Sequence, residues 1–240
     1  MNLYKSLDDE WKRWLSFNVN NKCDKLELMN KCISNNFEPK QVASFLNIMK
    51  ECEWIETDKC IMLCKRNVLT AEECRIVIDN IKTGYQDSTV VGKGVDESRK
   101  SKTKFHMNLK WLDDKFHNFM GSGENFSETT QGTWYTPGGF YKQHTDFFNE
   151  TSIEKKFVHD YEKRGNRTWT ALMYLNDVTD GYGKTKFPFI NQEIAPEQGM
   201  VLCWYNLLPN GKGNTLTEHI AQEVKQEKFI VQKWYRCKQS

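Results

Sequence analysis

Residues 141–148 read YKQHTDFF and follow the turn sequence TPGG at 136–139. In an extended segment, side chains two positions apart point to the same face, which predicts that His144 and Asp146 share one face of a strand. An imidazole and a carboxylate are two of the three ligands that facial metal sites use. A His-x-Asp pair also occurs on ordinary surface strands, so the rest of the chain has to decide between these interpretations.

The composition excludes some classes of protein. The chain has 240 residues and a formal net charge of +2, and its lysines do not form the basic stripe of a dedicated nucleic-acid binder. The first residues, MNLYKSLDDEWKRW, contain no apolar signal core, and no apolar run is long enough to span a membrane. We therefore expect a cytoplasmic protein with reduced cysteines, no membrane partner and no nucleic-acid partner.

The first 54 residues differ in pattern from the remainder. Apolar residues recur at helical spacing up to about residue 50, which predicts a helical unit of two or three helices over residues 1–54. Pro39 can open one of these helices. Further on, Thr70 and Glu73 have the spacing of a capping box at the start of a helix.

Residues 55–240 are expected to form the main domain. From about residue 131 the chain reads as short apolar segments separated by turns, which predicts a β-sandwich or barrel of jelly-roll type. The charged segment 148–166 interrupts these strands and is predicted to be partly helical. The polar, Gly-rich segment 90–103 is predicted to be a loop, either a plain solvated loop or a lid over a site.

The third metal ligand should be a histidine from a distant strand. The chain has only five histidines. Apart from His144 they are His106, His117, His159 and His219. His219 is the best candidate, because it precedes the C-terminal strand.

An anion site completes this chemistry. A dicarboxylic cosubstrate such as 2-oxoglutarate binds iron at one end, and its far carboxylate needs a cation. Lys228 begins the next strand, nine residues after His219, and a buried ammonium needs a partner. The alternative is a lysine on the solvent face of an edge strand, which is the prediction for Lys225 and Lys233.

The C-terminal half resembles the prolyl 4-hydroxylase family of Fe(II)- and 2-oxoglutarate-dependent dioxygenases. Five motifs occur in the family's order: YTPGGFYKQHTD (135–146), RTWTALMYLND (167–177), GYGKTKFP (181–188), IAPEQG (194–199) and HIAQEVKQEKFIVQKW (219–234). Weaker similarity extends upstream, so the resemblance covers roughly residues 60–236. It implies an α+β fold, with a double-stranded β-helix (a cupin-like jelly roll) as its core and flanking helices.

The resemblance also implies roles for particular residues. His144, Asp146 and His219 would be the iron ligands, and Lys228 would bind the far carboxylate of 2-oxoglutarate. The other residues with implied roles are Tyr135 and Thr185, which would hydrogen-bond that carboxylate, and Tyr141, Arg167 and Trp234, which would line the site for a peptidyl proline.

The chain departs from the family pattern at four places. Tyr182 and Gly183 replace a Gly-Gly pair, and the spacing from His219 to Lys228 is one residue shorter than the common form. Glu223 and Val224 stand where the family often has a proline. These three departures concern loop geometry more than metal binding.

The fourth departure concerns the substrate. Arg236 stands where several family members carry a histidine near the substrate, which leaves the substrate open. The expected reaction is hydroxylation of an unactivated C–H, with O₂ as oxidant, 2-oxoglutarate as cosubstrate and ascorbate as a candidate reductant. The leading substrate is a prolyl residue in a protein or peptide.

Three alternatives to a prolyl substrate stand beside it. The first is hydroxylation of another residue, a free amino acid or a small metabolite. The second is nucleic-acid demethylation, against which the near-neutral charge counts. The third is a binding module with a degenerate site, against which the complete set of His, Asp, His and Lys counts. The sequence leaves the oligomeric state open.

Overall fold

The computed structural model describes residues 4–57, 60–88, 98–149, 153, 155–179 and 181–238. Its helices are α1 (Asp9–Asn20), α2 (Lys25–Ser34), α3 (Pro39–Leu46), α4 (Ala71–Lys82), α5 (Lys110–Met120) and α6 (Lys155–Arg164). Its strands are β1 (Glu53–Ile55), β2 (Met62–Lys65), β3 (Gln86–Asp87), β4 (Arg99–Lys100), β5 (Lys102–Lys104), β6 (Gln131–Tyr135), β7 (Phe140–His144), β8 (Arg167–Tyr174), β9 (Thr185–Phe187), β10 (Gln192–Ile194), β11 (Val201–Tyr205), β12 (His219–Ala221) and β13 (Lys228–Arg236).

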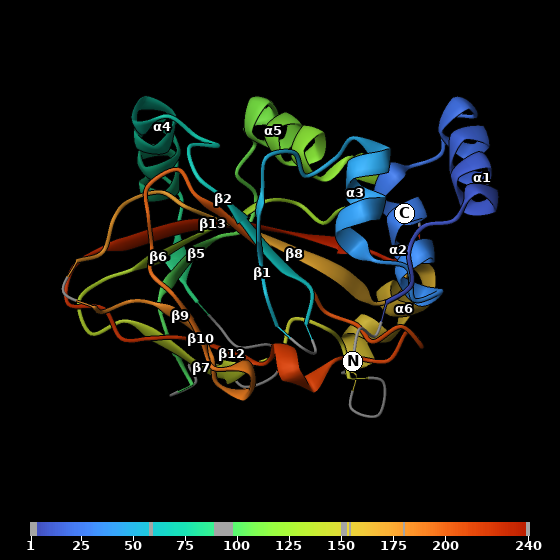
Figure 1. Cartoon of the computed structure of the whole chain (residues 1–240). Helices are drawn as coiled ribbons and strands as arrows, with labels where there is room; N and C mark the ends of the chain where they lie inside the picture. The colour runs from blue at the N-terminus through green and yellow to red at the C-terminus, as the bar shows by residue number, and fades with distance from the viewer. Residues whose placement is uncertain are drawn as a thin grey trace.

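The strands form two antiparallel sheets that face each other (Figure 1). The larger sheet has eight strands in the order β1-β2-β11-β8-β13-β6-β5-β3, and the smaller has five in the order β10-β9-β12-β7-β4. Helices α1 to α5 lie on the outer side of the larger sheet (Figure 1). This is the α+β double-stranded β-helix that the sequence predicts.

Alternation along the central strands divides the core into two layers. On β8, Trp169, Ala171 and Met173 belong to the cluster shared with the helices, whereas Leu172 and Tyr174 belong to the cluster between the sheets. Successive side chains of a strand point to opposite faces, so one strand contributes to both layers. The layer between the sheets is the one that surrounds the candidate site.

The N-terminal helices begin at acidic caps. The carboxylates of Asp8, Asp24 and Glu38 accept hydrogen bonds from free backbone N–H groups of the first turns of α1, α2 and α3. Such caps satisfy donors that a helix leaves unpaired and complement its dipole. The capping box predicted at Thr70 and Glu73 is confirmed at the start of α4.

The N-terminal helices share their core with the larger sheet. Leu15 of α1 and Met29 of α2 are fully buried, in the same cluster as Trp169 of β8. The indole Nε1 of Trp169 donates to Oδ1 of Asn30 at 2.8 Å. The apolar spacing of this segment predicts helices that pack on the main domain, and the shared core confirms both.

Two predictions about the strands need correction. Lys233 does not face solvent: it is 3% exposed, and its Nζ lies 2.6 Å from Oδ1 of Asp113. The reason is that β13 lies between β6 and β8 and is no edge strand. The second concerns residues 60–69, CIMLCKRNVL, whose apolar character predicts a strand: the strand that forms, β2, covers only Met62–Lys65. Helix α5 was not predicted.

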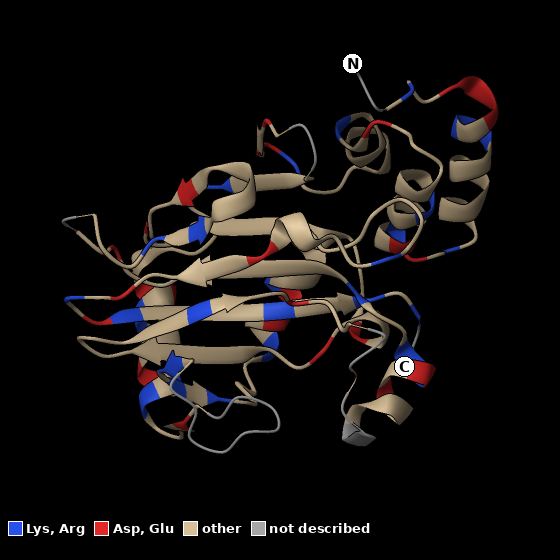
Figure 2. Cartoon of the chain, turned by 90° about the horizontal axis from the view of Figure 1, so that it is seen from below, with Lys and Arg blue, Asp and Glu red and all other residues tan. Residues whose placement is uncertain are grey.

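The predicted lid at 90–103 falls partly on residues 90–97, outside the described residues; residues 98–103 contribute to β4 and β5. Seen from below, basic and acidic residues are interspersed along the strands (Figure 2). Within the described part of the chain, no helix combines the length and apolar composition that a bilayer crossing requires.

Candidate metal and cosubstrate site

Two strands of the smaller sheet bring the two histidines together. His144 is the last residue of β7 and His219 is the first residue of β12, and the register of these antiparallel strands places the two residues opposite each other. Side chains of directly opposed residues on one face are near neighbours. Their ring centroids are 4.2 Å apart.

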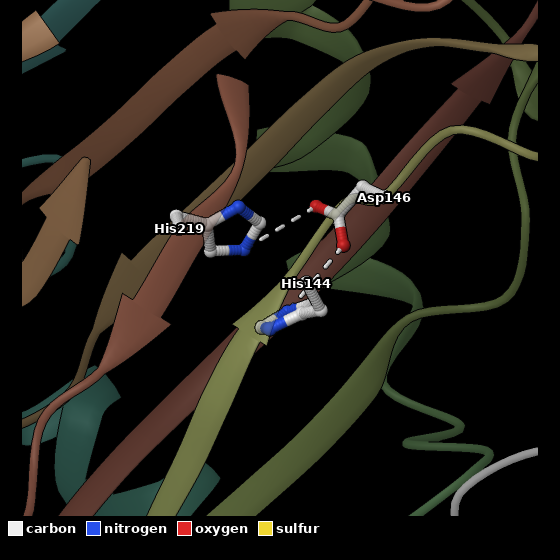
Figure 3. Close-up of side chains that lie close together, drawn as sticks. All are labelled: His144, Asp146 and His219. Carbon is white, nitrogen blue, oxygen red and sulfur yellow. Dashed lines mark ion pairs between the residues drawn. The ribbon is translucent and has the colours of Figure 1, made fainter. Parts of the chain in front are cut away.

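Asp146 reaches the site in a way that the sequence did not predict. It lies in a bend, two residues beyond the end of β7, and not on the strand with His144. Its carboxylate nevertheless turns toward both imidazoles (Figure 3). Oδ1 lies 3.9 Å from Nε2 of His144, and Oδ2 lies 4.0 Å from Nε2 of His219.

Backbone carbonyls fix the orientation of both imidazoles. Nδ1 of His144 donates to the carbonyl of Lys142 at 2.8 Å, and Nδ1 of His219 donates to the carbonyl of Thr217 at 3.0 Å. Because a carbonyl can only accept, the proton of each neutral ring sits on Nδ1. The lone pair of each Nε2 therefore faces the centre of the site, as a metal ligand requires.

A chain of hydrogen bonds orients the carboxylate. The hydroxyl of Thr170 on β8 donates to Oδ2 of Asp146 at 2.7 Å, and Nδ2 of Asn206 donates to the same hydroxyl at 2.9 Å. The sequence carried a signal for Thr170, since it falls on the inward-facing alternation of β8, but that signal was not used.

The pKa values in this group suit a cation. Burial, with the neighbouring His219, lowers the pKa of His144 to about 3, so its imidazole is neutral at physiological pH. Burial alone would raise the pKa of Asp146, but His219 and His144 outweigh it and lower this pKa. The neutral imidazole of His144 beside the ionised carboxylate of Asp146 favours binding of a cation in this buried site.

The triad opens into a pocket of about 530 Å³ between the two sheets. One face of β13 lines it along its whole length, through Lys228, Ile230, Gln232, Trp234 and Arg236. A larger groove of about 930 Å³ lies between α3 and β1. Among the described residues, the cluster able to hold a metal lies in the smaller pocket, so the chemistry points there.

Lys228 forms the inner end of the pocket. It is 1% exposed, its Nζ donates to the carbonyl of Gly183 at 2.6 Å, and no acidic partner for it occurs among the described residues. Burial lowers its pKa to about 7. A buried ammonium without a carboxylate favours an anionic ligand.

The two residues predicted to assist Lys228 lie beside it. Tyr135 is paired with Lys228 across β6 and β13, and Nζ lies 5.5 Å from its ring centroid. The hydroxyl of Thr185 accepts from the hydroxyl of Tyr174 at 2.7 Å, so its own proton is available to a carboxylate. Both side chains line the pocket.

Tyr141 and Trp234 offer aromatic surface further along the pocket. The ring of Tyr141 stacks on His144 with centroids 3.6 Å apart. The Arg167 guanidinium lies 4.0 Å from the ring centroid of Trp234, whose Nε1 is buried without a hydrogen-bond partner in the described structure. Aromatic faces of this kind suit an apolar ring.

Arg167 and Arg236 share one carboxylate, that of Glu128. Nε and NH2 of Arg167 bind both oxygens of Glu128 at 2.7 and 2.6 Å, and NH1 donates to the backbone carbonyl of Asp146 at 3.3 Å. NH1 of Arg236 binds the same carboxylate at 2.7 Å. In the described structure these nitrogens bind protein acceptors. The contacts of both arginines with a substrate stay predictions.

Glu128 was missed by sequence reasoning. It lies in a polar segment, and its two partners are 39 and 108 residues away, so no local pattern marks it. Burial alone would raise the pKa of Glu128, but the two guanidinium groups lower it to about 2. Of the other histidines, His117 contacts Ser127, and the exposed His106 and His159 are outside the metal cluster.

The donor set fits Fe(II). The nitrogen and oxygen atoms of His144, Asp146 and His219 lie within 4.8 Å of one another. Non-haem Fe(II) oxygenases hold the metal with two histidines and one carboxylate, which leaves other coordination positions of the iron open. Lys228 lies in the same pocket and fits the second acidic end of a dicarboxylate such as 2-oxoglutarate.

Comparisons with known proteins agree with this geometry. The family model of the 2OG-Fe(II) oxygenase superfamily matches residues 130–236. The chain is 28% identical over 152 residues to "Probable prolyl 4-hydroxylase 3" of Arabidopsis thaliana, covering 59% of this chain. It spans 48% of that relative, or about half its length.

Two solved structures share the fold. The viral collagen prolyl hydroxylase of Paramecium bursaria Chlorella virus-1, in its 2OG complex, has a TM-score of 0.56 and 24% identity, covering 73% of this chain and 95% of that one. A prolyl hydroxylase from Trichoplax adhaerens, in complex with a peptide fragment of the hypoxia inducible factor oxygen degradation domain, has a TM-score of 0.55 and 15% identity, covering 89% and 96%. In its motifs, its fold and its metal-ligand cluster, the chain is similar to the prolyl 4-hydroxylases among the 2OG-Fe(II) oxygenases.

Proposed function

We propose that the protein is an Fe(II)- and 2-oxoglutarate-dependent dioxygenase that hydroxylates a prolyl residue in a protein or peptide. The observation that carries this proposal is the pocket that holds the triad and the buried Lys228 together. A metal site alone would fit many reactions. A metal site with a buried, unneutralised ammonium fits a cosubstrate that is chelating at one end and anionic at the other.

The side chains have separate tasks in this proposal. His144, Asp146 and His219 would hold Fe(II), which supplies O₂ activation coupled to decarboxylation of 2-oxoglutarate. Lys228 would neutralise the far carboxylate of the cosubstrate, with hydrogen bonds from Tyr135 and Thr185. Keeping this ion pair out of water strengthens it.

Binding of the substrate is assigned to the other end of the pocket. Trp234 and Tyr141 would pack on the proline ring, and the buried Nε1 of Trp234 is a donor for a peptide carbonyl. The prolyl substrate is supported by relatives named prolyl 4-hydroxylases. Ascorbate as reductant, a cytoplasmic location and the domain boundary at residues 54 and 55 stay predictions from the sequence.

The first test is anaerobic reconstitution with Fe(II) and 2-oxoglutarate. We expect a weak charge-transfer band in the visible. After admission of air, succinate should form faster with a proline-rich peptide, which should gain the mass of one oxygen atom. Slow succinate formation without peptide modification would keep the dioxygenase and exclude that peptide as substrate.

Matched variants assign the signal to the site. Asp146→Ala should abolish both the band and succinate formation. His159→Ala, which changes an exposed histidine of α6 outside the metal cluster, should leave both unchanged. Full succinate formation by Asp146→Ala would overturn the ligand assignment.

A further inference from the structure

Helix α6 forms a wall of the same pocket. Phe157 and Asp160 of α6 line the cavity that contains the triad and Lys228. The half-buried residues of this helix recur at positions 157, 160, 161 and 164, whereas Val158, His159, Glu162 and Lys163 are exposed. This spacing presents one helix face to the protein.

Arg236 ties that face to the end of β13. Its side chain is 1% exposed, and NH2 lies 2.9 Å from Oδ2 of Asp160. Nε donates to the carbonyl of Gly165, just after α6, at 3.0 Å. NH1 binds Glu128 at 2.7 Å. The guanidinium thus joins the larger sheet, the segment that carries Glu128 and helix α6.

Phe148 provides a second attachment. Its ring centroid lies 4.9 Å from the guanidinium carbon of Arg236 and 5.0 Å from that of Arg167. The same ring contacts Phe157 and Tyr161 of α6, with centroids 6.2 and 6.1 Å apart. Because Phe148 is two residues from Asp146, α6 is attached to the segment that supplies the carboxylate of the triad.

We propose that Arg236, acting through Asp160, is a positioning residue that holds α6 as the substrate-facing wall of the pocket. This inference rests on the function proposed above. The wall lies at the Trp234 end of β13, away from Lys228. Its position should therefore control affinity for the peptide and leave that for 2-oxoglutarate unchanged.

The test uses Asp160→Asn, which keeps the shape of the side chain and removes its charge. The matched control is Glu162→Gln, an exposed carboxylate of the same helix. Loss of a charge-assisted hydrogen bond should raise KM for the prolyl peptide about tenfold. The KM for 2-oxoglutarate and kcat should stay within about twofold of the wild-type values, since the bond between Asp160 and Arg236 lies at the other end of β13 from Lys228.

Hydrogen exchange of residues 155–164 gives a readout that does not depend on turnover. We expect faster exchange of α6 in Asp160→Asn than in wild type or Glu162→Gln, and recovery in Asp160→Glu. Identical exchange in Asp160→Asn and Glu162→Gln would refute the positioning role. Faster exchange with an unchanged peptide KM would refute α6 as a substrate wall.

The two proposals fail in different ways. A wild-type protein that modifies no prolyl peptide would refute the proposed substrate, and the exchange of α6 would still decide whether Arg236 and Asp160 position the helix. A rise of both Michaelis constants together in Asp160→Asn would indicate general damage to the pocket and would overturn the inference.

Discussion

Replacing Glu128 by Gln tests how the buried charges of the pocket are balanced. The carboxylate lies between the guanidinium groups of Arg167 and Arg236 and is 15% exposed. Gln has nearly the same shape but carries no charge, so two buried cations would lose their shared partner. Removal of one member of a buried ion pair is strongly destabilising.

The size of the effect follows from the pKa of Glu128. Burial alone would raise this pKa, but Arg167 and Arg236 lower it from 4.5 to about 2. At about 1.4 kcal/mol for each pH unit, this difference corresponds to about 3 kcal/mol of unfolding free energy at pH 7. The Glu128→Gln variant should lose about that amount.

The pH dependence has a definite sign. Because the pKa of Glu128 is lower in the folded protein, the unfolded chain takes up the proton first as the pH falls. The contribution of Glu128 is therefore complete above about pH 4.5 and is lost between pH 4.5 and 2. By pH 3 the wild type should have lost about 2 kcal/mol of this contribution to the unfolding free energy. The difference in unfolding free energy between wild type and Glu128→Gln should therefore be smaller at pH 3 than at pH 7.

Urea unfolding followed by tryptophan fluorescence, at pH 7 and at steps down to pH 3, measures both quantities. Glu193→Gln is the control, because Glu193 binds two lysines at the surface and should contribute little. A Glu128→Gln variant as stable as wild type at pH 7, or a gap that does not change with pH, would refute this account of the ion cluster.

Three further changes test other parts of the molecule. Thr170→Val removes the hydrogen bond to Asp146 and should weaken Fe(II) binding about tenfold in a metal titration, without loss of fold by circular dichroism. Lys228→Met should raise KM for 2-oxoglutarate at least about tenfold. Burial lowers the pKa of Lys228 from 10.5 to about 7, so the charged lysine destabilises the folded protein. The Lys228→Met variant should therefore have a higher unfolding free energy than wild type below pH 7, and this difference should shrink as the pH rises toward 10.5. Thr70→Ala breaks the capping box of α4 and should cost about 1 kcal/mol in urea unfolding, whereas an unchanged midpoint would show that the cap contributes nothing.

The parts predictable from the sequence are those with a local signal. The helices of residues 1–54 and the capping box at Thr70 follow from spacing and side-chain type. The residues of the triad and Lys228 follow from donor chemistry together with the resemblance. Asp146 was assigned to the strand of His144, because the bend that ends β7 has no marker in the sequence HTD.

The remaining parts depend on contacts between distant segments. Lys233 was expected in solvent, but its strand lies inside the larger sheet and its partner, Asp113, is 120 residues away. Glu128 gains its role only from two arginines that the fold brings to it. Periodicity reports which face of an element is apolar, and it cannot report which charged side chains meet there.

The metal-ligand triad connects the two sheets. His144 and His219 belong to β7 and β12 of the smaller sheet, while Asp146 is hydrogen-bonded to Thr170 on β8 of the larger one. A cation bound by all three would act as a cross-link between two layers that also meet through apolar side chains and through hydrogen bonds such as that from Tyr174 to Thr185. Removal of the metal by a chelator should therefore speed amide hydrogen exchange in β7 and β12 more than in β8 and β13. Iron would then stabilise the fold in addition to supplying the chemistry.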